Sequence, residues 1–180
     1  MDYDRIRDAI SRVAPGCENY NERVSVPGGF YLPNPPREGR FPTPDGKAHF
    51  SSHPLRKIEV EPGRFLLTTI RSHDQFNTTI YGFKDRYRGV DGGRHVLFMN
   101  EADIVSHSFE AGQPVDITSH FDDGERSIKR FTVVPYKIPK GCVAAYFPEA
   151  NALVPLGSVA ERSGTPTSKS IVVSLAPAAA

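Results

Sequence analysis

A polar stretch that follows an apolar run is the first feature of this sequence that suggests chemistry. Residues 68–82 read TTIRSHDQFNTTIYG and come directly after Phe65-Leu66-Leu67. In such a stretch an arginine can contact a phosphate through two hydrogen bonds, hydroxyls and amides can bind a heterocycle edge, and a carboxylate can accept from ring N–H groups. This mixture suits a large, polar, anionic ligand, and a turn whose polar groups bond to one another explains it equally well. The candidate residues are Thr69, Arg71, Ser72, His73, Asp74, Gln75 and Thr78.

Other groupings of reactive residues carry less weight. The run SHD at 72–74 has the residue types of a hydrolytic triad, but consecutive side chains diverge and triad members normally come from separate segments. His49 and His53 have a spacing that binds metal on a helix face, yet the proline that follows argues against a helix. Cys17 and Cys142 form no C-x-x-C pair. We therefore predict neither a catalytic residue nor a metal ligand in this chain.

Two later segments add candidate ligand contacts. YFPEANALVP at 146–155 places Asn151 in a turn before an apolar run, where its amide either faces a ligand or satisfies the turn. Lys169 is a lone cation just before the last predicted strand. DRYRG at 85–89 interleaves basic residues with an aromatic one, as some single-strand-binding proteins do, although a solvated loop is the better interpretation in a neutral chain.

Composition places the chain among globular proteins and limits its partners. Of 180 residues, 38% are apolar and 24% charged, and the formal net charge is +1. Bulk charge therefore favours neither nucleic acid nor an anionic membrane as a partner, and any anion site needs local donors. The first 20 residues lack the apolar region of a signal peptide, and no run reaches transmembrane length. We predict a cytoplasmic location.

Short strands are the elements that would position these candidates. KIEVE at 57–61 alternates apolar and polar residues, and RFLLTTI at 64–70 is a continuous apolar run, typical of a strand buried on both faces. Further strand patterns lie at 94–100, 113–120, 129–138, 141–148 and 168–175, with a hairpin turn at 121–127. Six or seven strands and a few short helices predict a mainly β protein with a closed or nearly closed barrel.

Helical signals are few. DYDRIRDAISRVA at 2–14 repeats apolar residues at helical spacing and ends at Pro15-Gly16. A short helix is expected within 100–109, with Asn100 as its N-cap. Residues 27–47 contain six prolines, so we expect an extended loop there.

Three segments together resemble the last domain of molybdopterin oxidoreductases. They are RFPTPDGKAHF at 40–50, FLLTTIRSHDQFNTTIYG at 65–82, and YFPEANALVPLGS at 146–158 followed by TPTSKSIVVSL at 165–175. Within that superfamily the sequence is most similar to formate-dehydrogenase-like alpha subunits, which carry TIRSHDQFNTTIYG followed by DRYRG. The resemblance covers about residues 37–176, and the order and spacing of the segments match.

The resemblance implies a six-stranded double-psi β-barrel that covers one side of a molybdenum cofactor carried on molybdopterin guanine dinucleotide. In such domains the first loop contacts pterin and phosphate groups, and a late asparagine and a lysine near the last strand reach the same cofactor. The matching residues here are Thr69, Arg71, Ser72, His73, Asp74, Gln75, Thr78, Asn151 and Lys169.

The resemblance also implies a division of labour in a larger subunit. Residues 1–36 would end the preceding domain with one helix, 37–176 would form the cofactor-binding barrel, and 177–180 would be a tail. The metal ligand would lie in an earlier domain, so the 180 residues alone would be inactive and their partners would be the preceding domains and the pterin cofactor. The alternative is a stand-alone β-barrel that binds an anionic small molecule or single-stranded nucleic acid.

Overall fold

The computed structural model describes residues 2–55, 58–77 and 79–179. Contacts divide the chain into two compact units, residues 1–56 and residues 57–180. The predicted domain boundaries after residues 36 and 176 stay predictions.

The N-terminal unit is built around two helices, α1 (Tyr3–Val13) and α2 (Tyr20–Val24). The predicted first helix is confirmed, and the Asp2 carboxylate accepts from the backbone N–H groups of its first turn. The short helix α2 was not predicted. It has only five residues, and its N-cap residue forms no side-chain hydrogen bond with the first turn. It packs on the polar side of α1, where Asn21 accepts from Arg7 Nε at 2.6 Å.

The proline-rich segment after α2 is extended for most of its length, as predicted, except for one short turn of 3-10 helix, η1 (Pro35–Glu38). Two prolines occupy its first positions. A backbone N–H at these positions has no partner within the helix, so the N–H that proline lacks costs no hydrogen bond. The Asn34 side chain accepts from Arg37 N at 3.4 Å and Gly39 ends the turn at φ 71°.

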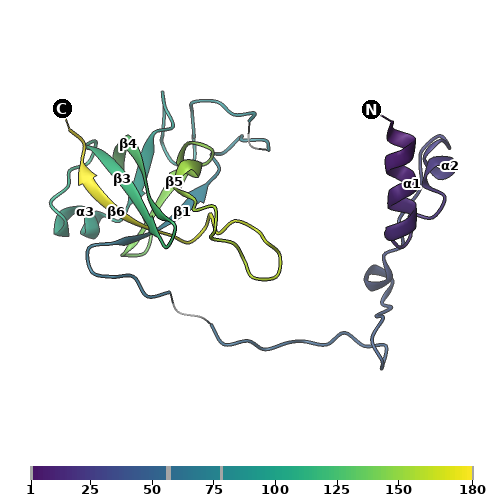
Figure 1. Cartoon of the computed structure of the whole chain (residues 1–180). Helices are drawn as coiled ribbons and strands as arrows, with labels where there is room; N and C mark the ends of the chain where they lie inside the picture. The colour runs from purple at the N-terminus through teal and green to yellow at the C-terminus, as the bar shows by residue number, and fades with distance from the viewer. Residues whose placement is uncertain (1, 56–57, 78, 180) are drawn as a thin grey trace. The chain divides into compact units, whose positions relative to one another are not determined.

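The second unit is a closed six-stranded barrel (Figure 1). The prediction of a mainly β barrel with a few short helices is confirmed, and its double-psi form stays a prediction. Its strands are β1 (Phe65–Ile70), β2 (Val96–Met99), β3 (Pro114–Phe121), β4 (Gly124–Pro135), β5 (Cys142–Tyr146) and β6 (Ile171–Pro177). Around the barrel they follow the order β1-β5-β2-β4-β3-β6. Two short helical segments, α3 (Glu101–Ser106) and η2 (Glu149–Leu153), lie between strands. As predicted, the Asn100 side chain caps α3 by accepting from Ala102 N at 2.9 Å.

The strand pairing sets which loops leave the barrel together. β1 runs parallel to β5, from Leu66 opposite Cys142 to Ile70 opposite Tyr146, and antiparallel to β6. Because parallel strands end at the same edge of a sheet, the segments that follow β1 and β5 start side by side.

Two strands show how burial follows position in the barrel. β1 was predicted to be buried on both faces, but its residues alternate between buried and half-buried, with Phe65, Leu67 and Thr69 facing inward. A barrel strand has one inner face, so an apolar run does not by itself indicate two buried faces. All four residues of β2 are buried, because Phe98 on its other face packs against Tyr146 and Val90.

The strand predicted at KIEVE, residues 57–61, is wrong for the described residues 58–61, which form no strand. Its alternation resembles a strand, but β1 already pairs with β5 on one edge and β6 on the other. No edge of β1 remains for it, and Ile58 is about half exposed, at 49%.

Candidate functional site

Three chain segments converge where β1 and β5 end. Phe147 N, just after β5, donates to Ile70 O at 2.8 Å, and Thr69 N donates to Ser168 O at 3.0 Å. The segments 71–75, 147–151 and 168–169 therefore begin at the same end of the barrel.

Side chains near β6 strengthen this junction. Thr69, which is buried, donates through Oγ1 to Ser168 O at 3.0 Å, and Thr68 Oγ1 donates to Lys169 O at 2.8 Å. Lys169 Nζ in turn donates to Thr69 O, which places this cation beside the start of the first loop.

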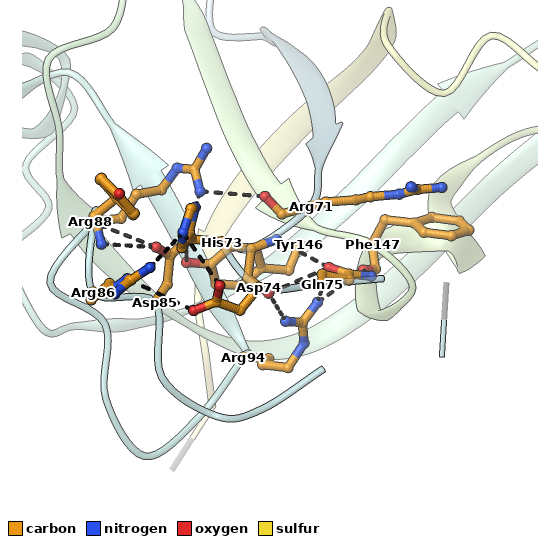
Figure 2. A network of polar contacts seen from close by, with 12 residues as sticks. Arg71, His73, Asp74, Gln75, Asp85, Arg86, Arg88, Arg94, Tyr146 and Phe147 are labelled. Atoms are coloured by element: carbon orange, nitrogen blue, oxygen red, sulfur yellow. Dashed lines mark hydrogen bonds and ion pairs between the residues drawn. The ribbon is translucent and has the colours of Figure 1, made fainter. Parts of the chain in front are cut away.

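A buried arginine from a third loop holds the first two segments together. Arg94 is only 2% exposed, and its guanidinium donates from Nη1 to Ser72 Oγ at 2.6 Å and from Nη2 to Gln75 Oε1 at 3.0 Å. The same group donates from Nη2 to Phe147 O at 2.9 Å and from Nε to Glu149 Oε1 at 2.6 Å. One planar cation thus reaches both the loop after β1 and the loop after β5 (Figure 2).

Aromatic rings enclose this arginine. Its Cζ lies 3.9 Å from the centroid of the Tyr81 ring and 4.7 Å from that of Tyr146. Contacts of this kind favour a desolvated guanidinium. Gln75 completes the link, since its Nε2 donates to Phe147 O at 2.8 Å and its Oε1 accepts from Ser72 N at 3.0 Å.

A buried carboxylate, Asp85, forms a second link at this end of the barrel (Figure 2). Asp85 accepts from the Tyr146 hydroxyl at 2.8 Å, from Arg88 Nη1 at 2.6 Å and from the backbone N–H of His73 at 3.3 Å. Burial by itself raises the pKa of Asp85, but these hydrogen bonds outweigh it, and the net pKa is lowered. The pKa of Tyr146 is raised, first by burial and then by its bond to Asp85.

The tip of the first loop carries a half-buried histidine. The His73 ring lies 3.9 Å from the Tyr87 ring, centroid to centroid, and its Nε2 is 3.0 Å from Arg86 Nη2 and 3.3 Å from Asp74 Oδ1. Asp74 has φ 62°, in the left-handed region that non-glycine residues seldom occupy. The backbone is therefore held in a strained turn at an exposed polar position.

Comparison with known proteins identifies the domain that carries this geometry. The family model described as "Molydopterin dinucleotide binding domain" matches residues 65–172, which span the whole barrel up to the start of β6. The chain belongs to this family.

Its relatives are much longer proteins. An uncharacterized oxidoreductase of Mycobacterium tuberculosis and one of Mycobacterium bovis are each 55% identical to it, over 99% of this chain and 24% of the relative. Protein YdeP of Escherichia coli is 41% identical, over 98% of this chain and 24% of that protein. The chain spans about a quarter of the length of these curated relatives, and it is a molybdopterin dinucleotide binding domain of an oxidoreductase family.

Within this molybdopterin dinucleotide binding domain, the residues that we predicted to contact the cofactor fall into two groups. Thr69, Ser72 and Gln75 are buried, and their side chains bond to other parts of the protein. The side chains of Arg71, Asp74, Asn151 and Lys169 lie on exposed residues, and His73 is half-buried. Thr78 lies outside the described residues.

Asn151 is the predicted contact that follows β5 in the chain. It lies in η2, with its backbone N–H donating to Pro148 O at 2.9 Å. Together with Arg126 and Pro155 it lines a shallow pocket of about 410 Å³. The strand pairing brings Asn151 to the same end of the barrel as the first loop, but the described contacts do not join their side chains directly.

Sequence reasoning missed the charged residues that organise this end, Arg94 and Asp85. Arg94 precedes an apolar strand and Asp85 belongs to DRYRG, which reads as a solvated loop. Each is 2% exposed. One signal was available, since a charge that adjoins a fully apolar run such as VLFM must be paired if it is buried.

Residues 2–55, 58–77 and 79–179 contain no cluster of three or more His, Cys, Asp or Glu side chains able to hold a metal ion. No helix in those same ranges is long and apolar enough to cross a membrane.

Proposed function

We propose that this domain holds molybdopterin guanine dinucleotide in a molybdenum-dependent, formate-dehydrogenase-like oxidoreductase. The observation that carries the proposal is the convergence of exposed Arg71, Lys169 and Asn151 at one end of a barrel that belongs to the molybdopterin dinucleotide binding family. They come from three segments that start side by side. The guanine form of the dinucleotide, the metal and the reaction belong to the proposal.

The donor chemistry at this end fits such a cofactor. A dinucleotide presents a pyrophosphate, which cationic side chains bind well, and heterocycles whose edges pair with amides and carboxylates. Exposed Arg71 and Lys169 are the candidates for the phosphates, and Asn151 and Asp74 for the heterocycle edges. His73 adds a ring beside Asp74. Thr69, Ser72 and Gln75 support the loop from inside.

In this proposal the bound cofactor supplies the two-electron redox chemistry, and the protein orients it. The metal ligand comes from another part of the longer protein, so residues 2–179 bind and position rather than catalyse. The partners of this domain are then the remaining three quarters of a chain as long as its relatives. A formate-like substrate stays a prediction, because fold and cofactor do not fix the reaction. A cytoplasmic location also stays a prediction.

The stand-alone alternative draws on the DRYRG segment, which could bind a single strand through Arg86, Tyr87 and Arg88. Two observations favour the cofactor domain instead. Arg88 pairs with buried Asp85 at 2.6 Å, and the Tyr87 ring contacts His73 and lies 5.2 Å from Arg86 Cζ. Arg88 is thus held by a buried carboxylate, and Arg86 and Tyr87 lie against His73 of the loop after β1.

The test is the cofactor content of Arg71→Ala in the full-length protein. Molybdenum measured by mass spectrometry and guanine nucleotide released by acid are both expected to fall relative to wild type. The matched control is Arg64→Ala, which alters an arginine at the other end of β1 that pairs with Glu61 at 3.2 Å. Unchanged metal and nucleotide in Arg71→Ala would count heavily against the proposal.

A further inference from the structure

We propose that Arg94 is a positioning residue that fixes the distance between the two cofactor-facing loops of this domain. The inference rests on the proposed function, since it assigns to that site a residue that is almost fully buried, at 2% exposed. It extends the account, because Arg94 belongs to a third loop, just before β2.

Arg94 can fix this distance because its guanidinium donates hydrogen bonds to both loops. Ser72 and Gln75, on the loop after β1, accept from Nη1 and Nη2 at 2.6 and 3.0 Å. The Phe147 carbonyl and the Glu149 carboxylate, on the loop after β5, accept from Nη2 and Nε at 2.9 and 2.6 Å. A planar guanidinium fixes the angles between these bonds, so the two loops cannot shift independently while all four persist.

The residues held by Arg94 adjoin the exposed candidates. Ser72 follows Arg71 directly, Gln75 follows Asp74, and Glu149 lies two residues before Asn151. A displacement of either loop would therefore change the spacing between the groups proposed to bind phosphate and those proposed to bind the rings. Sites that orient a cofactor are sensitive to such displacements, because misplacement by about 1 Å is enough to impair them.

Lysine cannot replace this function. Arg94→Lys keeps the positive charge but offers a single ammonium, which cannot reach four acceptors on two loops in fixed directions. Glu149→Gln, by contrast, keeps an oxygen that can accept from Arg94 Nε. A positioning role thus predicts that the charge-conserving variant fails and the variant that conserves the hydrogen bond largely succeeds.

The experiment compares wild type with Arg94→Lys, Glu149→Gln and the control Arg64→Lys in the full-length protein, at a temperature where all remain folded. The amide hydrogen exchange rate of Ser72 measures how firmly the loop after β1 is held, because Ser72 N donates to the same Gln75 oxygen that accepts from Arg94. In Arg94→Lys the Ser72 amide should exchange about tenfold faster. Leu66 N, which donates to Gly141 O at 2.9 Å at the start of β1, should be unchanged. Cofactor content should fall severalfold in Arg94→Lys and stay near wild type in the other two.

The outcomes separate this inference from the proposed function. If wild type contains no pterin or guanine nucleotide, the proposed function fails, while the exchange data still test whether Arg94 holds the loops. If wild type is loaded and Arg94→Lys keeps both its cofactor and its slow Ser72 exchange, Arg94 is not a positioning residue. If Arg94→Lys does not fold, Ser72→Ala serves instead. It removes the acceptor of Arg94 Nη1 and keeps the backbone N–H that donates to the Gln75 oxygen, so unchanged amide exchange at position 72, corrected for the intrinsic rates of serine and alanine, would overturn the inference.

Discussion

Two sets of polar residues lie at one end of the barrel, and they differ in burial rather than in residue type. The inner set, Ser72, Gln75, Asp85 and Arg94, is at most 9% exposed, and its members bond to one another or to neighbouring protein groups. The outer set, Arg71, Asp74, Asn151 and Lys169, is exposed. Neighbours in sequence, such as Arg71 and Ser72, belong to different sets. Polar variety in a loop therefore reflects two tasks, holding the loop in place and presenting groups to a ligand.

The physical cost of each task is different. A buried charge needs a partner and enough hydrogen bonds, and removing one member leaves the others unsatisfied. An exposed charge contributes little to stability because water screens it. Substitutions in the inner set should thus lower the free energy of unfolding, and substitutions in the outer set should act on ligand binding with little loss of stability.

The largest effect is expected for Arg94→Met. The change leaves the Glu149 carboxylate without its cation. It also removes the hydrogen bonds that Arg94 donates to Ser72, Gln75 and Phe147 O. Breaking a buried ion pair from one side typically costs about 3–5 kcal/mol in free energy of unfolding. Chemical denaturation of the protein freed of cofactor measures it. Arg64→Met, on a partly exposed pair, should cost less than about 1 kcal/mol, and equal losses in both variants would remove the distinction between the sets.

Asp85→Asn should have the next largest effect, and it should depend on pH. The pKa of Asp85 is lowered in the folded protein, so its contribution to stability is present above the ordinary carboxyl pKa, about 3.9, and is lost as pH falls through the folded value. Near neutral pH the variant should lose about 2–3 kcal/mol, because charged hydrogen bonds to Tyr146 and Arg88 are weakened.

The difference between wild type and Asp85→Asn should shrink as the solution is acidified below about pH 4. Denaturation curves at several pH values measure this difference, in which the other carboxylates with lowered pKa, such as Asp116 and Asp123, cancel. A difference that stays constant from neutral to acidic pH would show that the Asp85 charge contributes no stability.

Much of the fold could be predicted from the sequence, because strand patterns and turn residues are local signals. The six strands, the hairpin turn between β3 and β4, and the cap of α3 all follow from such signals. The failures arose where pairing decides the outcome. Residues 58–61 alternate like a strand but cannot pair with β1, because both edges of β1 are already paired. β1 has one buried face because a barrel has one interior.

The site was less predictable than the fold. The loop after β1 could be marked as a binding segment by residue types and by family resemblance, but neither indicates which side chains turn inward. Ser72 and Gln75 turn inward because they accept hydrogen bonds from Arg94, which lies 22 and 19 residues further along the chain, respectively. A contact between loops of this kind depends on the parallel pairing of β1 and β5, which no local pattern encodes.

A smaller effect, of opposite sign, is expected at the strained turn of the outer set. Asp74 is exposed and has φ 62°, so Asp74→Gly should raise the free energy of unfolding by about 0.5–1 kcal/mol. The same change should lower cofactor content, because it removes a carboxylate beside His73. Thermal unfolding and guanine nucleotide content measure the two effects. Asp91→Gly, an exposed aspartate paired with Lys84 at 3.4 Å, is the control and should leave cofactor content unchanged.

The most direct test compares two adjacent residues, Arg71 and Ser72, in one experiment. For Arg71→Ala and Ser72→Ala of the full-length protein, guanine nucleotide content and the free energy of unfolding without cofactor are measured side by side. Arg71→Ala should lose nucleotide while its stability stays within about 0.5 kcal/mol of wild type. Ser72→Ala should lose about 1–3 kcal/mol, because it leaves a buried donor of Arg94 without its acceptor. Equal losses of stability in the two variants, or full nucleotide content in Arg71→Ala, would contradict the division between inner and outer residues.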